Sequence, residues 1–173
     1  MIIIVGGPAG CGKSTVGDLL AEKIECSFLE GDAFHPQENI DKMAHGHPLT
    51  DDDRWKWLAT IAKEANETAE NSRVKTCVAG CSALKKKYRD FLREQAPNQL
   101  FVFVFINVDE DELWRRVTKR KNHYMKADMI QSQLSITEVP KEDEPNCLVY
   151  HNNVDIENCL QRIRELHAQS DKE

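Results

Sequence analysis

The sequence lacks the markers of several large protein classes. Its six cysteines form no CxxC pair and no zinc-type cluster with histidine, so it predicts neither a structural zinc site nor a disulfide framework. No apolar run approaches the length of a transmembrane helix. The opening segment MIIIVGG has no basic start and is too short for the apolar region of a signal peptide. We therefore expect a protein of the reducing cytoplasm without membrane contact.

The sequence has no excess of positive charge either. Its formal net charge is −6 at pH 7, which argues against a nucleic-acid-binding protein with a broad basic surface. An anionic small molecule in a locally basic cleft is compatible with this balance. No repeat, linker or low-complexity segment divides the 173 residues, and this length suits a single domain over 1–173.

What the sequence does contain is an alternation of apolar runs and amphipathic segments. Five runs are expected to form strands, at 2–5, 27–29, 75–79, 100–108 and 147–150, and the runs at 2–5 and 100–108 are apolar enough to be buried on both faces. Helical patterns occupy 16–24, 36–43, 51–70, 84–95, 109–121, 126–134 and 156–163. In the first helix Val16, Leu19, Leu20 and Ile24 share one face. The alternation predicts an α/β fold of three layers, with a five-stranded parallel sheet flanked by helices.

The segment GGPAGCGKST has the spacing Gly7-x-x-x-x-Gly12-Lys13-Ser14, which matches the Walker A phosphate-binding loop. Glycines let the backbone fold so tightly that successive N–H groups point at phosphate oxygens, and the following helix aims its positive end at the same anion. The lysine reaches the β- and γ-phosphates, and the serine hydroxyl binds Mg²⁺. The motif predicts a bound nucleotide with Mg²⁺.

Two absences narrow the class of P-loop protein. The Asn-Lys-x-Asp motif with which GTPases read guanine is missing, and a motor or a helicase needs a longer chain. A short α/β chain with a P-loop and basic residues late in its sequence suits a small phosphotransferase.

A carboxylate follows the second expected strand, in the segment LEGDAFHP. Ligands of open parallel sheets bind beyond the carboxyl ends of the strands, so Asp32 is placed to orient an attacking hydroxyl or to accept its proton. It can also help Ser14 to hold the metal through a water molecule. The structural alternative is an aspartate that caps a turn or a helix. His35 is either a functional residue or a local packing residue.

Cations are expected near the migrating phosphoryl group, because phosphoryl transfer needs positive charge there. Arg54 follows three aspartates and precedes an apolar helix face, and arginine binds carboxylates and phosphates bidentately. Lys85 and Arg89 stand one helical turn apart after the third strand, so they would share a face. The run RRVTKRKNHYMK at 115–126 is either a solvated helix face or a segment that closes over the nucleotide.

The strand at 100–108 is followed by Asp109 and therefore resembles a Walker B strand. Further acidic residues follow at once (Glu110, Asp111, Glu112), which is typical of a helix N-terminus. We therefore expect no catalytic role for Asp109.

Four blocks of the sequence carry a family resemblance: GPAGCGKST, GDAFHPQENIDKMAHGHPLTDDDRWKWL, CSALKKKYRDFLR and KNHYMKADMIQSQLSITEVP. Together they resemble the gluconokinases, the ATP-dependent kinases of D-gluconate, from the first strand to about residue 150. The resemblance implies a nucleoside-monophosphate-kinase-like P-loop fold with a helical lid at about 116–138. It also implies that ATP, with Mg²⁺, phosphorylates the 6-hydroxyl of D-gluconate to 6-phosphogluconate, which feeds the pentose phosphate pathway.

The resemblance assigns roles to residues of this chain. The ATP phosphates and Mg²⁺ would be bound by Gly7, Ala9, Gly10, Cys11, Gly12, Lys13, Ser14 and Thr15. The sugar acid would be surrounded by Asp32, His35, Arg54, Lys85 and Arg89, with Asp32 facing the acceptor hydroxyl. Arg116 and Arg120 would bind the nucleotide, and His123 would reach the substrate from the lid. Arg120 would be catalytic together with Lys13 and Asp32.

Some assignments stay open on the sequence alone. Arg54, Arg89 and Lys85 are all candidates for binding the gluconate carboxylate. The backbone near Asn152 and Asn153 is expected beside adenine. The resemblance is compatible with a homodimer.

Two other hypotheses compete with a gluconate kinase. A kinase of shikimate or of a nucleotide would share the fold, but shikimate kinases carry an Asp-x-Asp after the second strand, where this chain has Asp32-Ala33-Phe34. A regulatory nucleotide-binding module would not require a carboxylate that faces a hydroxyl.

Overall fold

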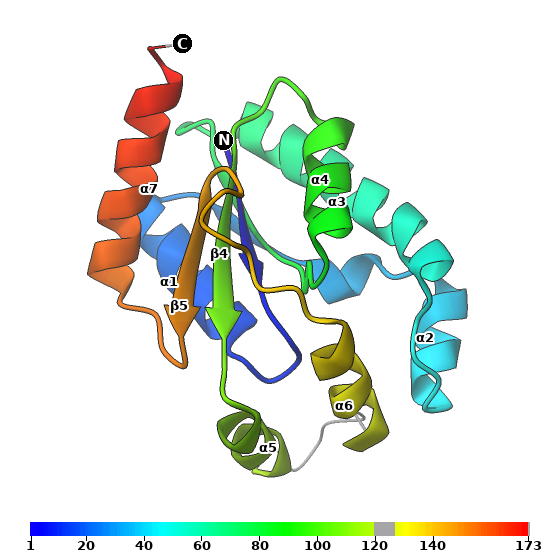
Figure 1. Ribbon diagram of the computed structural model, residues 1–173. Coiled ribbons are helices and arrows are strands. Elements are labelled where there is room, and N and C mark those ends of the chain that lie inside the picture. The colour runs from blue at the N-terminus through cyan, green and yellow to red at the C-terminus, as the bar shows by residue number, and fades with distance from the viewer. Residues whose placement is uncertain (120–126, 173) are drawn as a thin grey trace.

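A five-stranded parallel sheet organises the chain, whose computed structural model describes residues 1–119 and 127–172. The strands lie in the order β2-β3-β1-β4-β5 (Figure 1). They are β1 (Ile2–Gly6), β2 (Ser27–Glu30), β3 (Cys77–Gly80), β4 (Phe101–Asn107) and β5 (Cys147–His151). All neighbouring strands pair in parallel, as their apolar sequences predict.

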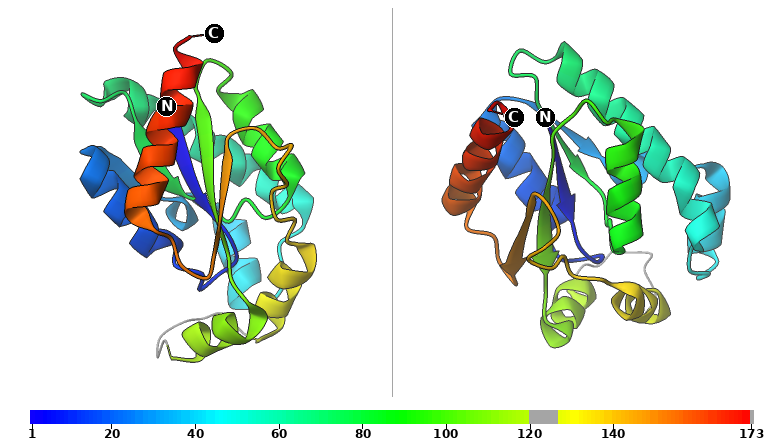
Figure 2. Two further views of the ribbon diagram at one scale, coloured as in Figure 1. Left: turned by 60° about the vertical axis from the view of Figure 1, so that its left-hand side comes forward. Right: turned by 45° about the horizontal axis from the view of Figure 1, so that its top comes forward.

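Helices cover both faces of this sheet. The described helices are α1 (Lys13–Ile24), the 3-10 helix η1 (Gly31–Phe34), α2 (Gln37–Ala44), α3 (Asp51–Asn71), α4 (Lys86–Gln95), α5 (Glu110–Thr118), α6 (Ala127–Ile136) and α7 (Ile156–Ser170). Figure 2 shows α1 and α7 on one side of the strands and α3 with α4 on the other. The predicted α/β fold of three layers is confirmed.

The apolar core has two halves, one on each face of the sheet. On one face Ile4 of β1 and Leu58 of α3 belong to the same buried cluster. On the other face Ile3 of β1 is buried with Leu20 of α1 and Leu160 of α7. Because successive residues of a strand point to opposite faces, a strand buried on both faces needs an unbroken apolar sequence.

The predicted face of α1 is confirmed for Val16, Leu20 and Ile24, which pack in one core cluster, and is wrong for Leu19. Leu19 is 40% exposed, whereas Gly17, Leu20 and Ala21 are buried. A Cβ on Gly17 would lie 2.3 Å from a ring carbon of Phe28. The small residue at 17 therefore lets α1 pack closely against β2, which turns Leu19 toward solvent.

The N-terminus of α3 is fixed by a capping box. The side chain of Thr50 accepts a hydrogen bond from the backbone N–H of Asp53 at 3.3 Å, and the Asp53 carboxylate accepts the N–H of Thr50 at 2.8 Å. This arrangement satisfies N–H groups that the helix leaves unpaired. It fixes the start of α3, where Arg54 lies in the first turns.

The loops that leave the central strands meet at one edge of the sheet. β3 and β2 lie on one side of β1, and β4 and β5 lie on the other. Open α/β sheets bind ligands beyond the carboxyl ends of their strands, where the strand order reverses. Figure 1 shows α5 and α6 beyond this edge.

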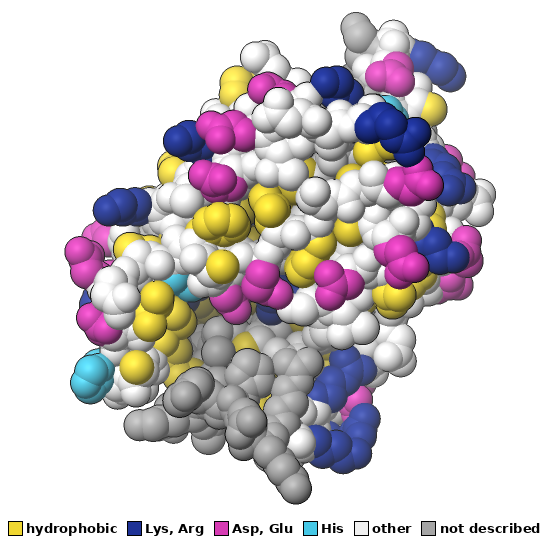
Figure 3. Space-filling view, turned by 180° about the vertical axis from the view of Figure 1, so that it is seen from behind, with side chains coloured by type: hydrophobic (Ala, Val, Ile, Leu, Met, Phe, Trp, Pro, Cys, Tyr) yellow, Lys and Arg dark blue, Asp and Glu magenta, His cyan; other side chains and the backbone are white. Residues whose placement is uncertain are grey.

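Charged side chains of both signs are distributed over the surface. Figure 3 shows acidic and basic residues interspersed on the face behind the view of Figure 1. Mixed charge of this kind gives little long-range attraction for a polyanion. Within residues 1–119 and 127–172, no helix has the length and the apolar character needed to cross a membrane.

Candidate active site

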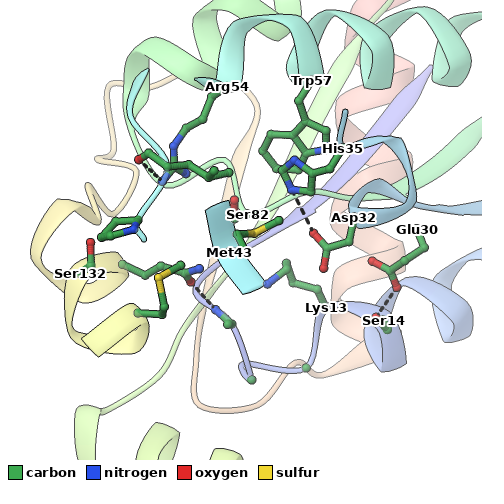
Figure 4. Close-up of a pocket in the computed structure, with 17 residues that line it drawn as sticks. Lys13, Ser14, Glu30, Asp32, His35, Met43, Arg54, Trp57, Ser82 and Ser132 are labelled. Atoms are coloured by element: carbon green, nitrogen blue, oxygen red, sulfur yellow. Dashed lines mark hydrogen bonds and ion pairs between the residues drawn. The ribbon is translucent and has the colours of Figure 1, made fainter. Parts of the chain in front are cut away.

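A cavity of about 430 Å³ opens at the carboxyl edge of the sheet (Figure 4). It is lined by the loop between β1 and α1, by the segment after β2, by the start of α3 and by α6. Ser82, just after β3, completes the lining near the P-loop. The cavity brings together side chains that are far apart in the sequence, and its size suits a small ligand.

The loop between β1 and α1 has the backbone that a phosphate cradle needs. Gly7 has φ +132°, and a Cβ there would lie 2.6 Å from the carbonyl oxygen of Ile106. Gly12 has φ +106° and stands as the N-cap of α1, where an added Cβ would meet no atom within 4 Å. The N-terminal end of α1 thus opens onto free space, where its N–H groups and dipole favour an anion.

The predicted phosphate-binding residues divide into two groups. Five of them line the cavity: Ala9, Gly10, Gly12, Lys13 and Ser14. The other three, which are Gly7, Cys11 and Thr15, do not line the cavity. Cys11 is 2% exposed and packs into the core between α1 and β4, so it acts as an apolar anchor.

The ammonium group of Lys13 lies over the loop. Its Nζ donates to the carbonyl oxygens of Gly7 and Pro8, both at 3.0 Å. These two bonds place the positive charge at the rim of the cradle. The N–H of Ala9 donates to Oε1 of Gln133 at 2.8 Å, which ties α6 to the same loop.

Two carboxylates, Glu30 and Asp32, enter the cavity from the end of β2. The hydroxyl of Ser14 donates to Glu30 Oε2 at 2.5 Å. Gly31 lies between the two carboxylate residues in the sequence. A Cβ on Gly31 would lie 2.0 Å from the carbonyl oxygen of Gly80. Trp57 donates through Nε1 to the Gly31 carbonyl at 2.8 Å. β2 therefore ends in a rigid turn that presents both carboxylates.

Glu30 was missed by sequence reasoning. An acidic-x-acidic pattern begins two positions before Asp32, as Glu30-Gly31-Asp32. The signal was in the sequence, because both residues stand at the end of the second strand. The Asp-x-Asp of shikimate kinases is absent, as the sequence shows, but Glu30 and Asp32 supply two carboxylates at the same place, so this motif alone does not separate the two kinases.

His35 is a buried imidazole beside Asp32. Its side chain is 5% exposed, and its ring stacks on Trp57 with centroids 4.1 Å apart. Nδ1 lies 3.2 Å from the amide nitrogen of Asn39, and Nε2 lies 3.8 Å from Asp32 Oδ1. Burial lowers the pKa of His35, while the Asp32 charge raises it and the Arg54 charge lowers it further. The balance favours the neutral ring.

Arg54 is a buried cation at the cavity wall. It is 6% exposed, and its guanidinium lies 5.4 Å from the centre of the Tyr88 ring. One terminal nitrogen donates to the carbonyl of Leu49 at 3.1 Å, whereas the buried Nε has no hydrogen-bond partner among the described residues. Within residues 1–119 and 127–172, no carboxylate forms an ion pair with it.

Arg89 lies away from the cavity, contrary to its expected place around the sugar acid. It is 1% exposed, and its guanidinium donates twice to Glu144, at 2.6 and 2.8 Å. A third bond of 2.8 Å reaches the carbonyl of Ala83. Burial raises the pKa of Glu144, but the hydrogen bonds and charge of Arg89 outweigh this and hold it below its ordinary value. This ion pair ties α4 to the loop before β5, and the bond to Ala83 orders the loop between β3 and α4.

Lys85 does not share a face with Arg89. It is the N-cap residue of α4, outside the helix proper, and its amine donates to Asp51 at 3.1 Å. Asp51 also accepts from Lys87 and from the hydroxyl of Tyr88. The prediction of a common face is wrong because the helix begins one residue after Lys85.

Arg116 lies behind the P-loop, on the side expected for the nucleotide. It donates to the carbonyl oxygens of Cys11 at 3.1 Å and of Asn152 at 2.9 Å, and to Asn153 at 3.4 Å. Its Nε also donates to Glu112 at 2.7 Å. The predicted neighbours Arg116, Asn152 and Asn153 are thus brought together. Arg120 and His123 lie outside the described residues.

Asp109 takes the N-cap position of α5, but its side chain does not cap the helix. It accepts instead from the amide of Asn152 at 2.8 Å and lies 3.1 Å from Nε2 of His151. Asp109 does not line the cavity, and the absence of a catalytic role stays a prediction.

The chain matches known proteins over most of its length. Residues 3–140 match the family model of an AAA domain. The thermoresistant gluconokinase of Escherichia coli K12 is 40% identical over 162 residues, which cover 94% of this chain and 88% of that protein. The crystal structure of a gluconokinase from Sinorhizobium meliloti 1021 has a TM-score of 0.79 at 40% identity, covering 98% of this chain and 93% of that one. A shikimate kinase from Bacteroides thetaiotaomicron, 17% identical with a TM-score of 0.58, shares the fold alone.

Proposed function

This chain belongs to the gluconokinase family of ATP-dependent carbohydrate kinases, and we propose that it transfers the γ-phosphoryl group of ATP to the 6-hydroxyl of D-gluconate. The products are ADP and 6-phospho-D-gluconate, which would feed the pentose phosphate pathway. The observation that carries the proposal is the buried Arg54 guanidinium, which lines the same cavity as the P-loop and Asp32. Gluconate offers a carboxylate for the arginine at one end and a primary hydroxyl for the aspartate at the other.

Arg54 is our candidate for binding the gluconate carboxylate. A buried charge is costly unless it is paired, and the Nε of Arg54 has no hydrogen-bond partner among the described residues. A ligand carboxylate that accepts from Nε and a terminal nitrogen would supply both the charge and the missing bond. Lys85 and Arg89 suit this role less well, because Lys85 already pairs with Asp51 and Arg89 already pairs with Glu144.

Asp32 is our candidate for the group that faces the acceptor hydroxyl. The side chain is 76% exposed toward the cavity, and it follows β2 at the edge where the P-loop presents the phosphates. The hydroxyl oxygen forms a bond to the γ-phosphorus as the bond to the ADP oxygen breaks, and the hydroxyl proton passes to Asp32. Lys13 contributes positive charge over the phosphate oxygens during the transfer.

Ser14 and Glu30 would hold Mg²⁺. A hydroxyl and a carboxylate that already touch at 2.5 Å form an all-oxygen donor set, which suits a hard cation that keeps several water ligands. The bound metal would neutralise charge on the β- and γ-phosphate oxygens. Asp32 stands two residues from Glu30 and can contact the same hydration shell through water.

The remaining nucleotide contacts extend from the P-loop toward Arg116. We place the adenine near the backbone of Asn152 and Asn153, which Arg116 links to the P-loop. The family resemblance assigns Arg120 to the nucleotide site and His123 to the substrate. α6, which lines the cavity, belongs to the lid proposed at about 116–138, together with the end of α5.

An acceptor panel tests the proposal. The protein with Mg·ATP is supplied with gluconate, shikimate, glucose or AMP, and ADP release is followed for each. We expect turnover with gluconate alone, and coupling between phosphorus and carbon 6 in the NMR spectrum of the product. Turnover with another acceptor and none with gluconate would contradict the substrate. A phosphate on another carbon would contradict the 6-hydroxyl.

A further inference from the structure

Asn39 on α2 is a buried polar residue with two hydrogen-bonding neighbours. It is 2% exposed, and its Nδ2 donates to the backbone carbonyl of Asp53 at 2.8 Å. The same nitrogen lies 3.2 Å from His35 Nδ1. A carbonyl oxygen can only accept, so the atom that faces Asp53 must be the amide nitrogen and not the amide oxygen. Its second N–H is then available to His35 Nδ1.

This contact determines which ring nitrogen of His35 carries the proton. A neutral imidazole has one donor and one acceptor nitrogen, so an Nδ1 that accepts from Asn39 leaves the proton on Nε2. The stacking on Trp57, with an angle of 14° between the rings, holds the imidazole in this orientation. His35 therefore presents an N–H, and not a lone pair, to the cavity.

The Nε2–H group faces the carboxylate of Asp32 across a gap. The distance of 3.8 Å from Nε2 to Asp32 Oδ1 is too long for a direct hydrogen bond. A hydroxyl oxygen beside the gap can accept from Nε2–H while its own proton is donated to Oδ1. Because a hydroxyl oxygen has two lone pairs, one remains for bond formation with phosphorus.

We propose that Asn39 is a positioning residue, which fixes His35 as an Nε2–H donor so that His35 and Asp32 together orient the acceptor hydroxyl. The proposal rests on the function proposed above and explains how the same site recognises the acceptor hydroxyl group. With the proton on Nδ1 instead, two sets of lone pairs would face each other across the gap. The hydroxyl would then lose one of its two orienting contacts.

A merely structural role for Asn39 predicts different results. The side chain also joins α2 to the first turn of α3 through Asp53. Loss of that link alone would lower the stability of the fold and would leave the His35 proton on Nε2. The decisive measurement is therefore the protonation state of each ring nitrogen of His35. The second measurement compares the change in kcat/KM for gluconate with the change in KM for ATP.

The first experiment is ¹⁵N NMR of the histidine rings in the complete wild-type protein, with His35 assigned by comparison with His35→Gln. We expect Nε2 to be protonated and Nδ1 unprotonated at neutral pH. A proton on Nδ1 in the wild-type protein overturns the proposal, whatever the activity. The spectrum needs no substrate, so it still tests Asn39 if gluconate proves not to be the acceptor.

The second experiment compares three variants on α2. Asn39→Leu removes the donor, and we expect a mixture of ring tautomers and a roughly tenfold fall in kcat/KM for gluconate, with KM for ATP unchanged. Asn39→Asp replaces the donor by an acceptor, and we expect Nδ1 to become protonated with at least the same loss. Gln37→Leu removes an exposed amide from the same helix and serves as the control with unchanged kinetics.

Two results would overturn the proposal at this stage. One is a folded Asn39→Leu protein that keeps the wild-type kcat/KM for gluconate. The other is a fall of equal size in the ATP and gluconate parameters, which indicates a general structural role. If Asn39→Leu does not fold, the wild-type spectrum and Asn39→Asp decide the question.

Discussion

The two halves of the cavity are built in different ways. In the phosphate half the groups that face the cavity are backbone N–H groups, a helix N-terminus and one lysine, all within the loop between β1 and α1 and the first turn of α1. In the acceptor half they are side chains from η1 and α3, held by α2 and by the end of β2. One half depends on local backbone conformation, and the other depends on the packing of distant elements.

This difference determines how far each half follows from the sequence. A P-loop is recognisable because a fixed spacing of Gly7, Gly12 and Lys13 produces one local conformation. The partners of the acceptor residues are set by tertiary packing, which leaves no fixed spacing to find. The predictions below test whether the two halves also fail differently when single residues are changed.

The largest effect is expected from Lys13→Ala in the phosphate half. Removing the cation that lies over the cradle should lower kcat by about 10³-fold or more, because charge on the transferring group is no longer offset. The two bonds from Lys13 are to carbonyls of its own loop, so we expect little change in the melting temperature. Steady-state kinetics and thermal unfolding check both points. Near-normal activity would contradict the assignment of the P-loop.

Asp32→Asn tests the acceptor half at its reactive end. An amide cannot take the hydroxyl proton, so we expect kcat to fall by about 10²- to 10⁴-fold, the range for loss of a general base. ATP affinity should stay close to that of the wild-type protein, since Asp32 lies outside the P-loop. Equilibrium titration with ATP separates the two effects. A variant that loses ATP binding to the same extent would show that the halves are not independent.

Arg89→Leu is expected to act on stability alone. It removes the bidentate partner of the buried Glu144 and leaves only the longer 3.6 Å pair with Arg93, which costs up to about 3–5 kcal/mol of unfolding free energy. Arg89→Leu combined with Glu144→Leu should recover most of this loss, because no unpaired charge remains. Urea denaturation of both proteins measures the difference. If Arg89→Leu stays fully stable and instead raises KM for gluconate, then Arg89 binds substrate after all.

The smallest effect is expected from Lys85→Ala. The amine pairs with Asp51 at a partly exposed position, and such pairs contribute about 0–1 kcal/mol. We expect kcat/KM for gluconate to remain within about twofold of wild type, because a single partly exposed ion pair contributes so little. A much larger fall would move Lys85 into the substrate site. Lys86→Ala, which removes an exposed amine from the next position, is the matched control.

The sequence predicted the scaffold better than the acceptor site, for identifiable reasons. The unbroken apolar runs at β1 and β4 allow only strands buried on both faces, so the parallel sheet follows. Only Leu19 was wrongly placed on the core face of α1, because Phe28 packs at Gly17, an apparently neutral residue. The spacing of apolar side chains in a helix does not reveal the close contacts that a glycine allows.

The acceptor site shows the same limit with charged residues. Arg54 and Arg89 look alike in the sequence, but Arg89 meets Glu144 from a loop 55 positions away, whereas no carboxylate pairs with Arg54 among the described residues. Asn39 stands four positions after His35, at a helical spacing that hints at contact. The burial that makes the contact important comes from α3 and could not be predicted locally.

The most direct test of the account is a comparison of two acceptors by wild-type protein and Arg54→Gln. D-glucitol has a hydroxymethyl group where gluconate has its carboxylate and is otherwise a similar polyol. We expect the wild-type protein to prefer gluconate by about 100-fold in kcat/KM, the value of a charged bidentate contact, and Arg54→Gln to lose that preference with KM for ATP unchanged. A variant that still prefers gluconate to the same degree would contradict the claim that Arg54 binds the carboxylate.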